Sequence, residues 1–448
     1  MIKMIKPLIT IFAMLKKEGV CVKNKKWQIL LDCAEVKINL KKIKPIIYYL
    51  LNNFEQKYFI VLQHVPYCLL PEASHHIVYK KNSKFKYFKK SRCKRCKYDL
   101  LCPGISEQRY KTLKEFPAAI PDIPEEVVFE LTQKCNLKCP LCFRQKKSKD
   151  LSWIKVKKTI DQCIKLGIKD LRFTGGEPLL YPDLGKVLRY AKSKGAYVTL
   201  NTNATLLNKD NQKILKQYVD NVLISLQGFD SVSENKLTKG KVDFKQKLKN
   251  IIYLQQTISL SRVGTIISQT LCRNFNKYFN IIHTLGIKHW ELYRPMSQKN
   301  ILEFKISQNA LRSLMNKMKM VREKGSIDLK ILNALPFCVT DDCDLSRYVL
   351  FGAQRDDGYS RLILDSKGLR PSYSMIKYLG QDIEVAWQSP FLKKLRDLKW
   401  VPQQCRLCSD LKWCRGGSRY LARIATGTYF GPDPLMNKKT RINSEKTK

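Results

Sequence analysis

The chain has 448 residues, of which 44% are hydrophobic and 27% are charged. This length leaves room for two or three domains with a sizeable core, and the composition is typical of globular rather than disordered or membrane-spanning proteins. No run of 18 apolar residues occurs, which excludes a transmembrane helix. The first apolar stretch, PLITIFAML at residues 7–15, is short and lacks a small-residue cleavage site. We therefore expect a helix or strand there rather than a signal peptide.

The chain is strongly basic, with 83 Lys and Arg against 38 Asp and Glu and a net charge of +45. Such a balance attracts nucleic acid, an anionic membrane or an acidic substrate. The basic residues are dispersed, however, and no nucleic-acid-binding motif accompanies them. The abundance of Ile, Asn, Tyr and Phe is also what an AT-rich genome would produce. Nucleic acid stays open as a partner on the ground of charge alone.

The 16 cysteines are grouped rather than scattered, in CxxxCxxC and CxxC patterns. In a long chain without a convincing signal peptide, this grouping favours metal ligation in a reducing compartment over disulfides. The sequence thus predicts a cytoplasmic, oxygen-sensitive metalloprotein.

Residues 1–120 form a small α+β domain in our interpretation, and they contain their own cysteines. The segment RCKRCKYDLLCPG at residues 92–104 holds Cys93, Cys96 and Cys102, and Cys68 lies shortly before it. Four thiols from one region indicate a zinc or an iron–sulfur site more than buried apolar thiols. No function beyond metal binding follows for this domain.

Residues 121–325 alternate short, β-rich apolar runs with amphipathic stretches. One of these stretches, LGKVLRYAKSKGA, closes on Gly195 as a helix C-cap would. Strand and helix repeated in this way predict parallel strands joined by right-handed crossovers, in a complete or partial barrel with its chemistry at the carboxyl ends of the strands. The expected strands are EEVVFEL (125–131), DLRFTG (170–175), YVTLNT (197–202), NVLISLQ (221–227), RVGTIIS (262–268) and HWELYR (289–294).

The loop after the first expected strand reads CNLKCPLC and holds Cys135, Cys139 and Cys142. Four thiolates close a structural zinc site or an ordinary iron–sulfur cluster, whereas three leave one position open. At the mouth of a barrel, an open iron of a [4Fe–4S] cluster could bind a ligand that the other strand ends hold. A zinc ion or a closed cluster completed by a distant cysteine remains the alternative.

Polar and glycine residues follow the next strands. GGEP at residues 175–178 offers two glycines, Gly175 and Gly176, that let backbone approach a ligand, and Glu177, whose carboxylate could meet a ligand ammonium. Asn203 follows the third strand and Ser225 ends the fourth. Alone, each signal is weak, because Gly-Gly-x-Pro is an ordinary turn and a serine at a strand end usually caps one.

Together, CNLKCPLC at 135–142, GGEP at 175–178 and the polar strand ends resemble the radical S-adenosylmethionine superfamily, over roughly residues 125–300. The resemblance implies a partial (β/α)6 barrel in which Cys135, Cys139 and Cys142 hold a [4Fe–4S] cluster. Its open iron would chelate the amino and carboxylate groups of S-adenosylmethionine. An electron from a one-electron donor would then cleave the sulfonium bond, and the resulting 5′-deoxyadenosyl radical would abstract hydrogen from a substrate.

The same resemblance assigns the ligand contacts. Gly175, Gly176 and Glu177 would bind the methionine amino group, and Ser225 and Asn203 would contact the ribose or the carboxylate. One position departs from the family pattern. The family usually has an aromatic residue immediately before the last cysteine, against the adenine, and here that position is Leu141.

Residues 405–419, CRLCSDLKWCRGGSR, repeat the C-x2-C-x5-C spacing of the N-terminal segment. They resemble the auxiliary-cluster domain called SPASM, found behind the radical barrel in enzymes that modify peptides and other substrates. The resemblance implies a SPASM-like extension over residues 326–436, with Cys405, Cys408 and Cys414 at one auxiliary iron–sulfur cluster. We expect the polar tail, residues 437–448, to fray.

Three ligand positions of the resembled domain are not cysteines in this chain. They hold Ser372, Ser418 and Met436. We therefore expect at most one C-terminal cluster, completed by a residue such as Asp433 or left open. Cys338 and Cys343 remain from a second cluster and are too few by themselves. A domain that has lost its metals and keeps only its shape is the open alternative.

The sequence thus predicts a radical enzyme of the oxidoreductase or of the peptide- or cofactor-maturation type, acting on an unidentified substrate. The SPASM-like tail favours a peptide or protein substrate, by analogy. The alternative is an iron–sulfur or zinc scaffold that binds nucleic acid without radical chemistry. The intact CxxxCxxC and GGEP favour the enzyme, because a decayed site would be expected to lose cluster ligands there.

Overall fold

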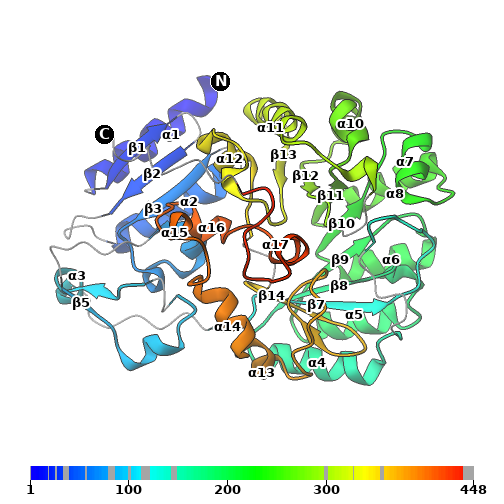
Figure 1. Ribbon diagram of the computed structural model, residues 1–448, viewed down its shortest axis with the longest axis horizontal. Helices are drawn as coiled ribbons and strands as arrows, with labels where there is room; N and C mark the ends of the chain where they lie inside the picture. Colours follow the sequence, from blue (N-terminus) through cyan, green and yellow to red (C-terminus); the bar gives the residue numbers. More distant parts are fainter. Residues whose placement is uncertain are drawn as a thin grey trace. The chain divides into compact units, whose positions relative to one another are not determined.

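The computed structural model describes residues 2–18, 20–25, 28–33, 40–55, 58–78, 86–98, 102–112, 122–142, 149–296, 301–325, 327–353 and 358–436. Contacts divide the chain into two compact units, Met1–Asp122 and Ile123–Lys448 (Figure 1). The separation of residues 326–436 as a domain of their own stays a prediction, and the tail from residue 437 lies outside the described residues.

The N-terminal unit is an α+β fold around a four-stranded sheet in the order β1-β2-β3-β4. Strands β1 and β2 are antiparallel, while β3 runs parallel to both β2 and β4. The apolar stretch at residues 7–15 lies within helix α1 and contributes Leu8, Ile11 and Leu15 to the core. The elements are α1 (Ile2–Lys17), β1 (Cys21–Lys25), β2 (Gln28–Asp32), α2 (Leu40–Phe54), β3 (Phe59–Gln63), β4 (Ile77–Val78), β5 (Tyr87–Phe88), β6 (Ile105–Ser106) and α3 (Glu107–Thr112).

The second unit is built on a nine-stranded sheet in the order β13-β12-β11-β10-β9-β8-β7-β14-β15. Only β15 pairs antiparallel with its neighbour. The six expected strands are present as β7 to β12, which confirms the α/β barrel-type fold. The strands are β7 (Glu126–Thr132), β8 (Asp170–Gly175), β9 (Tyr197–Thr202), β10 (Asn221–Ser225), β11 (Leu260–Ile266), β12 (His289–Tyr293), β13 (Asp328–Ile331), β14 (Arg361–Leu364) and β15 (Leu369–Arg370).

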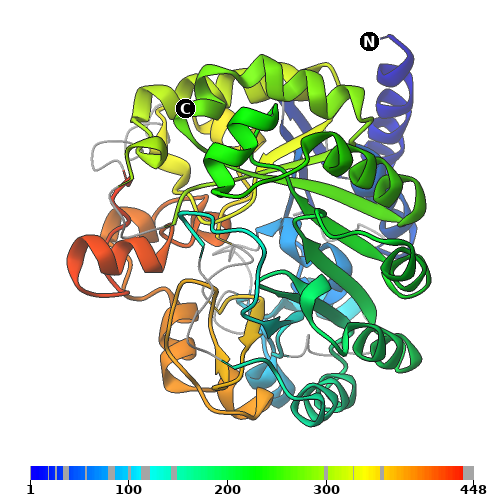
Figure 2. The same ribbon diagram turned by 90° about the vertical axis from the view of Figure 1, so that its right-hand side faces the viewer.

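Amphipathic helices connect these strands and cover the outer side of the curved sheet (Figure 2). Helix α4 begins at Ser152, whose hydroxyl accepts the Lys155 N–H, and it buries Val156 and Ile160 on one face. After α5, Gly195 adopts φ +76°, a left-handed conformation that suits glycine at a helix end. The helices are α4 (Trp153–Lys165), α5 (Leu184–Ser193), α6 (Lys209–Tyr218), α7 (Ser231–Thr238), α8 (Phe244–Thr257), α9 (Gln269–Arg273), α10 (Phe275–Thr284), α11 (Gln308–Glu323), α12 (Cys343–Val349), α13 (Ile383–Trp387), α14 (Pro390–Asp397), α15 (Gln403–Arg406), α16 (Leu411–Cys414) and α17 (Arg419–Thr426).

Strand β14 joins the C-terminal region to the barrel sheet, because it pairs in parallel with β7. A buried ion-pair network holds this junction. Glu126 on β7 binds Arg172 on β8 at 2.7 Å and Arg361 on β14 at 3.2 Å. The carboxylate therefore links three adjacent strands. None of the described helices has the length and apolar composition needed to cross a bilayer.

We predict that Glu126→Gln lowers the free energy of unfolding by about 3 kcal/mol, because it leaves two buried guanidinium groups without their counter-charge. Urea unfolding followed by circular dichroism measures the change. Arg312→Ala, at the exposed Arg312–Asp341 pair, is the control and should leave the midpoint nearly unchanged. Equal stability of the Glu126→Gln and wild-type proteins would contradict this role.

Candidate active site

A cavity of about 330 Å³ lies at the carboxyl ends of the barrel strands. Polar side chains at its wall come from successive strands, among them Glu130 of β7, Thr174 of β8, Asn201 of β9, Ser225 of β10 and Tyr293 of β12. The carboxyl ends of parallel strands meet at one edge, so residues far apart in the chain share one space. The residues expected at the site that line this cavity are Cys135, Cys139, Cys142, Gly175, Gly176, Asn203 and Ser225.

The three thiols come from the loop that leaves β7. The pairing of β7 with β8 shifts register between Glu130 and Thr132, an irregularity of the kind that redirects a strand end. The Thr132 hydroxyl then bonds Asp150 at 2.7 Å and accepts the Lys134 N–H at 3.0 Å. Further along, the Lys138 N–H donates to the Thr238 carbonyl at 3.2 Å. The loop is thus fastened on both sides of Cys135.

The thiols act on one another electrostatically. Burial first, and then the nearby thiols of Cys142 and Cys135, raise the pKa of Cys139 to about 12. Cys142 is the exposed member of the three. Thiols must lose their protons to bind metal, so the Cys139 thiol in particular would need the compensating positive charge of a metal centre.

Gly175 and Gly176 allow the loop after β8 to lie directly against the cysteine loop. A Cβ on Gly175 would lie 2.3 Å from the Thr132 carbonyl oxygen, and one on Gly176 would lie 1.9 Å from that of Lys134. Because these positions have no side chain, the Gly176 N–H bonds the Thr132 carbonyl at 2.6 Å. We expected the two glycines to let backbone approach a ligand. In the structure they let it approach the backbone of the cysteine loop, and both residues also line the cavity.

The carboxylate of Glu177 is held by donors within the protein. Among the described residues Glu177 is not part of the cavity wall, and its side chain is fully buried. It accepts the Thr202 hydroxyl at 2.7 Å, the Asn203 N–H at 2.8 Å and the Leu179 N–H at 3.2 Å. Through those three donors the side chain fastens the end of β9, and its contact with a ligand ammonium stays a prediction. A contact between ligand and the backbone at Glu177 stays a prediction.

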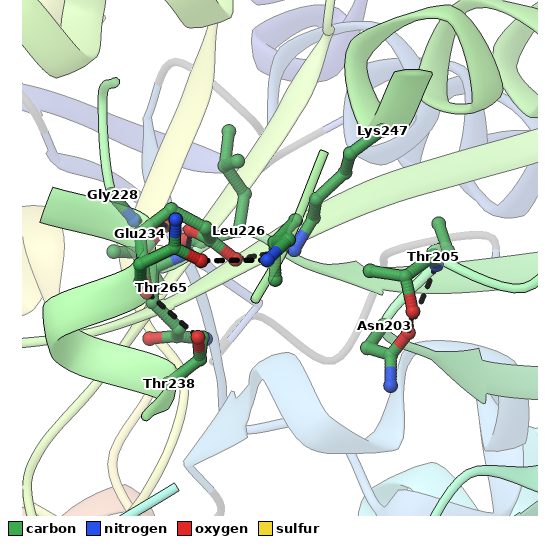
Figure 3. Close-up of polar contacts among 12 residues, drawn as sticks. Asn203, Thr205, Leu226, Gly228, Glu234, Thr238, Lys247 and Thr265 are labelled. Carbon is green, nitrogen blue, oxygen red and sulfur yellow. Dashed lines mark hydrogen bonds and ion pairs between the residues drawn. The ribbon is translucent and has the colours of Figure 1, made fainter. Parts of the chain in front are cut away.

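Asn203 lines the cavity and is itself held in place. Its side-chain oxygen accepts the Thr205 hydroxyl at 2.6 Å and the Thr205 N–H at 2.9 Å (Figure 3). Its NH2 group donates to Asn136 at 2.9 Å, in the middle of the cysteine loop. The ends of β7 and β9 are therefore joined through Asn136 and Asn203.

A buried ion pair, Glu234–Lys247, supports the loop after β10 and was not expected from the sequence. The Glu234 carboxylate accepts the N–H groups of Gln227 at 2.8 Å and Gly228 at 2.6 Å, and it binds the Lys247 ammonium (Figure 3). Both side chains are almost fully buried and line the cavity. The signal that could have found Lys247 is its place on the apolar face of α8, in step with Asn250, Ile251 and Leu254.

The two other cysteine groups lie elsewhere. In the N-terminal unit, burial and the nearby thiols of Cys102, Cys96 and Cys93 raise the pKa of Cys68 to about 12. The four thiols therefore lie close together, and a zinc or iron–sulfur site there stays a prediction.

The C-terminal group is Cys405, Cys408 and Cys414, as expected from the sequence, with Asp433 considered as a fourth ligand. Asp433 is occupied instead, because its carboxylate binds Arg294 at 2.7 and 3.0 Å and accepts the Ser418 N–H at 2.8 Å. Among the described residues no three His, Cys, Asp or Glu side chains are arranged to hold a metal ion. A cluster of several iron and sulfide atoms can span a looser set of thiols than one ion can.

The arrangement around the cavity fits a three-thiolate cluster with a ligand beside it. Three cysteines converge on one wall, close-packed glycine backbone forms the next, and Asn203 and Ser225 offer hydrogen-bonding groups. These groups are positioned by bonds within the protein, so they would need little rearrangement on binding.

Comparison with known proteins agrees with this geometry. Residues 129–268 match the family model described as the Radical SAM superfamily. The antilisterial bacteriocin subtilosin biosynthesis protein AlbA of Bacillus subtilis (strain 168) is 29% identical over 179 residues, which cover only 39% of either chain. The PqqA peptide cyclase of Gluconobacter oxydans (strain 621H) is 22% identical over 335 residues, covering 71% of this chain and 92% of the relative.

Among solved structures, Streptococcus suis SuiB bound to S-adenosylmethionine superposes with a TM-score of 0.58 at 18% identity. The match covers 71% of this chain and 78% of SuiB. At this level of identity the likeness shows a shared fold.

We predict that Gly176→Ala prevents assembly of a cluster at the three cysteines, because the added Cβ would push the two loops apart at Lys134. After anaerobic reconstitution, iron analysis should show about four iron atoms fewer per chain than in wild type, the content of one [4Fe–4S] cluster. Gly185→Ala is the matched control, since its Cβ meets only the flexible end of Ile214 at 3.1 Å. Full iron content in Gly176→Ala would refute the role given to this backbone contact.

Proposed function

We propose, from the premise that residues 129–268 form a domain of the Radical SAM superfamily, that this chain is an enzyme that reductively cleaves S-adenosylmethionine and abstracts hydrogen from a substrate. The observation that carries the proposal is the convergence of Cys135, Cys139 and Cys142 with Gly175, Gly176 and Ser225 on one cavity. When bound, the [4Fe–4S] cluster and S-adenosylmethionine would supply the electron transfer and the radical.

The protein's own residues would bind and orient these groups. Cys135, Cys139 and Cys142 would hold the cluster through three thiolates and leave one iron for the ligand. The backbone at Gly175 and Gly176 would take the amino end of the ligand, and the hydroxyl of Ser225 would bond the ribose or the carboxylate. Leu137 and Leu141 are buried and line the cavity, so they would exclude water beside the cluster.

We propose a peptide or protein as the substrate. The support comes from two relatives: AlbA is named as a bacteriocin biosynthesis protein, and the PqqA peptide cyclase is named for a peptide. SuiB has also been crystallised bound to its precursor peptide SuiA. The cavity is open and largely apolar beyond the strand ends, where Pro295, Met296 and Phe304 line it. Such a wall would receive a side chain presented by an extended chain.

The proposal predicts that the anaerobically reconstituted protein forms 5′-deoxyadenosine when given dithionite and S-adenosylmethionine, and that Cys142→Ala forms none. Removing one of the three thiolates deprives the cluster of a ligand that the described residues around the cavity do not replace. Liquid chromatography with mass spectrometry quantifies the product. Cys21→Ala, at an exposed thiol of the N-terminal unit, is the control and should keep wild-type product.

Absence of 5′-deoxyadenosine from a wild-type protein with its full iron content would overturn the enzyme. It would favour the alternative of a metal-binding scaffold for nucleic acid. That scaffold would bind its partner with a steep dependence on salt, because phosphate contacts release counterions.

A further inference from the structure

The C-terminal knuckle, residues 405–414, has the backbone turns of a metal-binding loop. The Cys408 N–H donates to the Cys405 carbonyl at 3.1 Å, and the Cys414 N–H donates to the Asp410 carbonyl at 2.8 Å. Cys405 and Cys408 are half-buried, and Cys414 is buried. The knuckle thus carries three thiols on one short, turned segment, and a closed centre needs a fourth.

Residues 336–353, which come earlier in the chain, pack closely against this knuckle. A Cβ on Gly352, which has φ +81°, would lie 2.3 Å from the Trp413 carbonyl oxygen, and the next residue, Ala353, donates its N–H to that oxygen at 2.9 Å. A Cβ on Gly417 would lie 2.8 Å from Pro336. The two glycines let residues 336–353 and the knuckle approach as closely as backbone allows.

An ion pair fastens the same contact. Arg347 of α12 binds the buried Asp410 at 2.7 Å and the Ser409 hydroxyl at 3.1 Å, both within the knuckle. Helix α12 is therefore tied to the loop between Cys408 and Cys414.

This packing brings Cys338 to the knuckle thiols. The two residues before it lie against the glycines of this contact, because a Cβ on Gly352 would lie 3.0 Å from the Phe337 ring and one on Gly417 would lie 2.8 Å from Pro336. The thiol of Cys338 is also an electrostatic neighbour of those of Cys405 and Cys414.

The other candidates for the fourth position are occupied or unsuited. Asp433 binds Arg294, and the Ser418 hydroxyl caps α17 by accepting the Leu421 N–H at 3.3 Å. Met436 places its sulfur 3.8 Å from that of Cys405, but a thioether carries no charge to replace a thiolate.

We propose that Cys338 is the fourth thiolate of a C-terminal metal centre completed by Cys405, Cys408 and Cys414. The centre would be a [4Fe–4S] cluster, which spans a looser set of thiols than a single metal ion does, and it would close without a ligand from further along the chain. It differs from the expectation from the sequence, in which Cys338 and Cys343 remained from a second cluster. It does not depend on radical chemistry, so it can stand if the proposed function fails.

The test starts from a triple variant without the active-site cluster, Cys135→Ala/Cys139→Ala/Cys142→Ala. In this background Cys338 and Cys343 are replaced one at a time. Iron, sulfide and zinc are measured per chain after anaerobic reconstitution. Relative to this background, Cys338→Ser should lose about four iron atoms per chain, the content of one [4Fe–4S] cluster. Cys343→Ser is the matched control and should lose nothing. Unchanged metal in Cys338→Ser, or an equal loss in Cys343→Ser, would overturn the proposal.

A measurement on the wild-type chain covers the case in which Cys338→Ser does not fold. Native metal-loaded protein is alkylated before and after chelation, and each cysteine is read by mass spectrometry. Cys338 should be protected together with Cys405, Cys408 and Cys414 and become reactive with them on metal removal, while Cys343 reacts alike in both states. Alkylation of Cys338 in the loaded protein at the rate of the chelated one would overturn the assignment.

Discussion

The active-site geometry depends on one backbone contact, between the loop that carries the cysteines and the loop after β8. The Gly176 N–H bonds the Thr132 carbonyl at 2.6 Å, and the Glu177 N–H bonds that of Lys134 at 2.8 Å, immediately before Cys135. This approach is possible only because residues 175 and 176 have no Cβ. This backbone contact fixes the position of Cys135 relative to the glycine loop. It therefore also determines the space that is left between the two loops for a ligand.

Two buried carboxylates extend this arrangement around the barrel mouth. Glu177 holds the end of β9 through Thr202 and Asn203, and Glu234 holds the turn after β10 through two backbone N–H groups and Lys247. A buried carboxylate is costly unless donors surround it, and here each accepts at least three. These two carboxylates therefore serve mainly to keep loops in place at the barrel mouth.

The parts of the fold that the sequence could predict are those written in local patterns. The six strands β7 to β12 follow from apolar runs between amphipathic helices, and the grouping of Cys135, Cys139 and Cys142 follows from their spacing. What it could not predict depends on contacts between distant segments. The direction of the Glu177 carboxylate depends on donors at the end of β9, and the pairing of β14 with β7 is held by a network around Glu126. The approach of residues 336–353 to the knuckle depends on Gly352 and Gly417. None of these contacts can be recognised from the local sequence pattern around the residues involved.

The proposed reaction requires that an iron held by these three thiolates binds S-adenosylmethionine directly in the cavity. Electron–nuclear double resonance of the reduced protein tests this binding, with S-adenosylmethionine isotopically labelled at its amino nitrogen and carboxylate oxygens. We expect hyperfine coupling of both labels to the cluster in the wild type. A fully reduced, fully loaded cluster that shows no coupling to either label would contradict it.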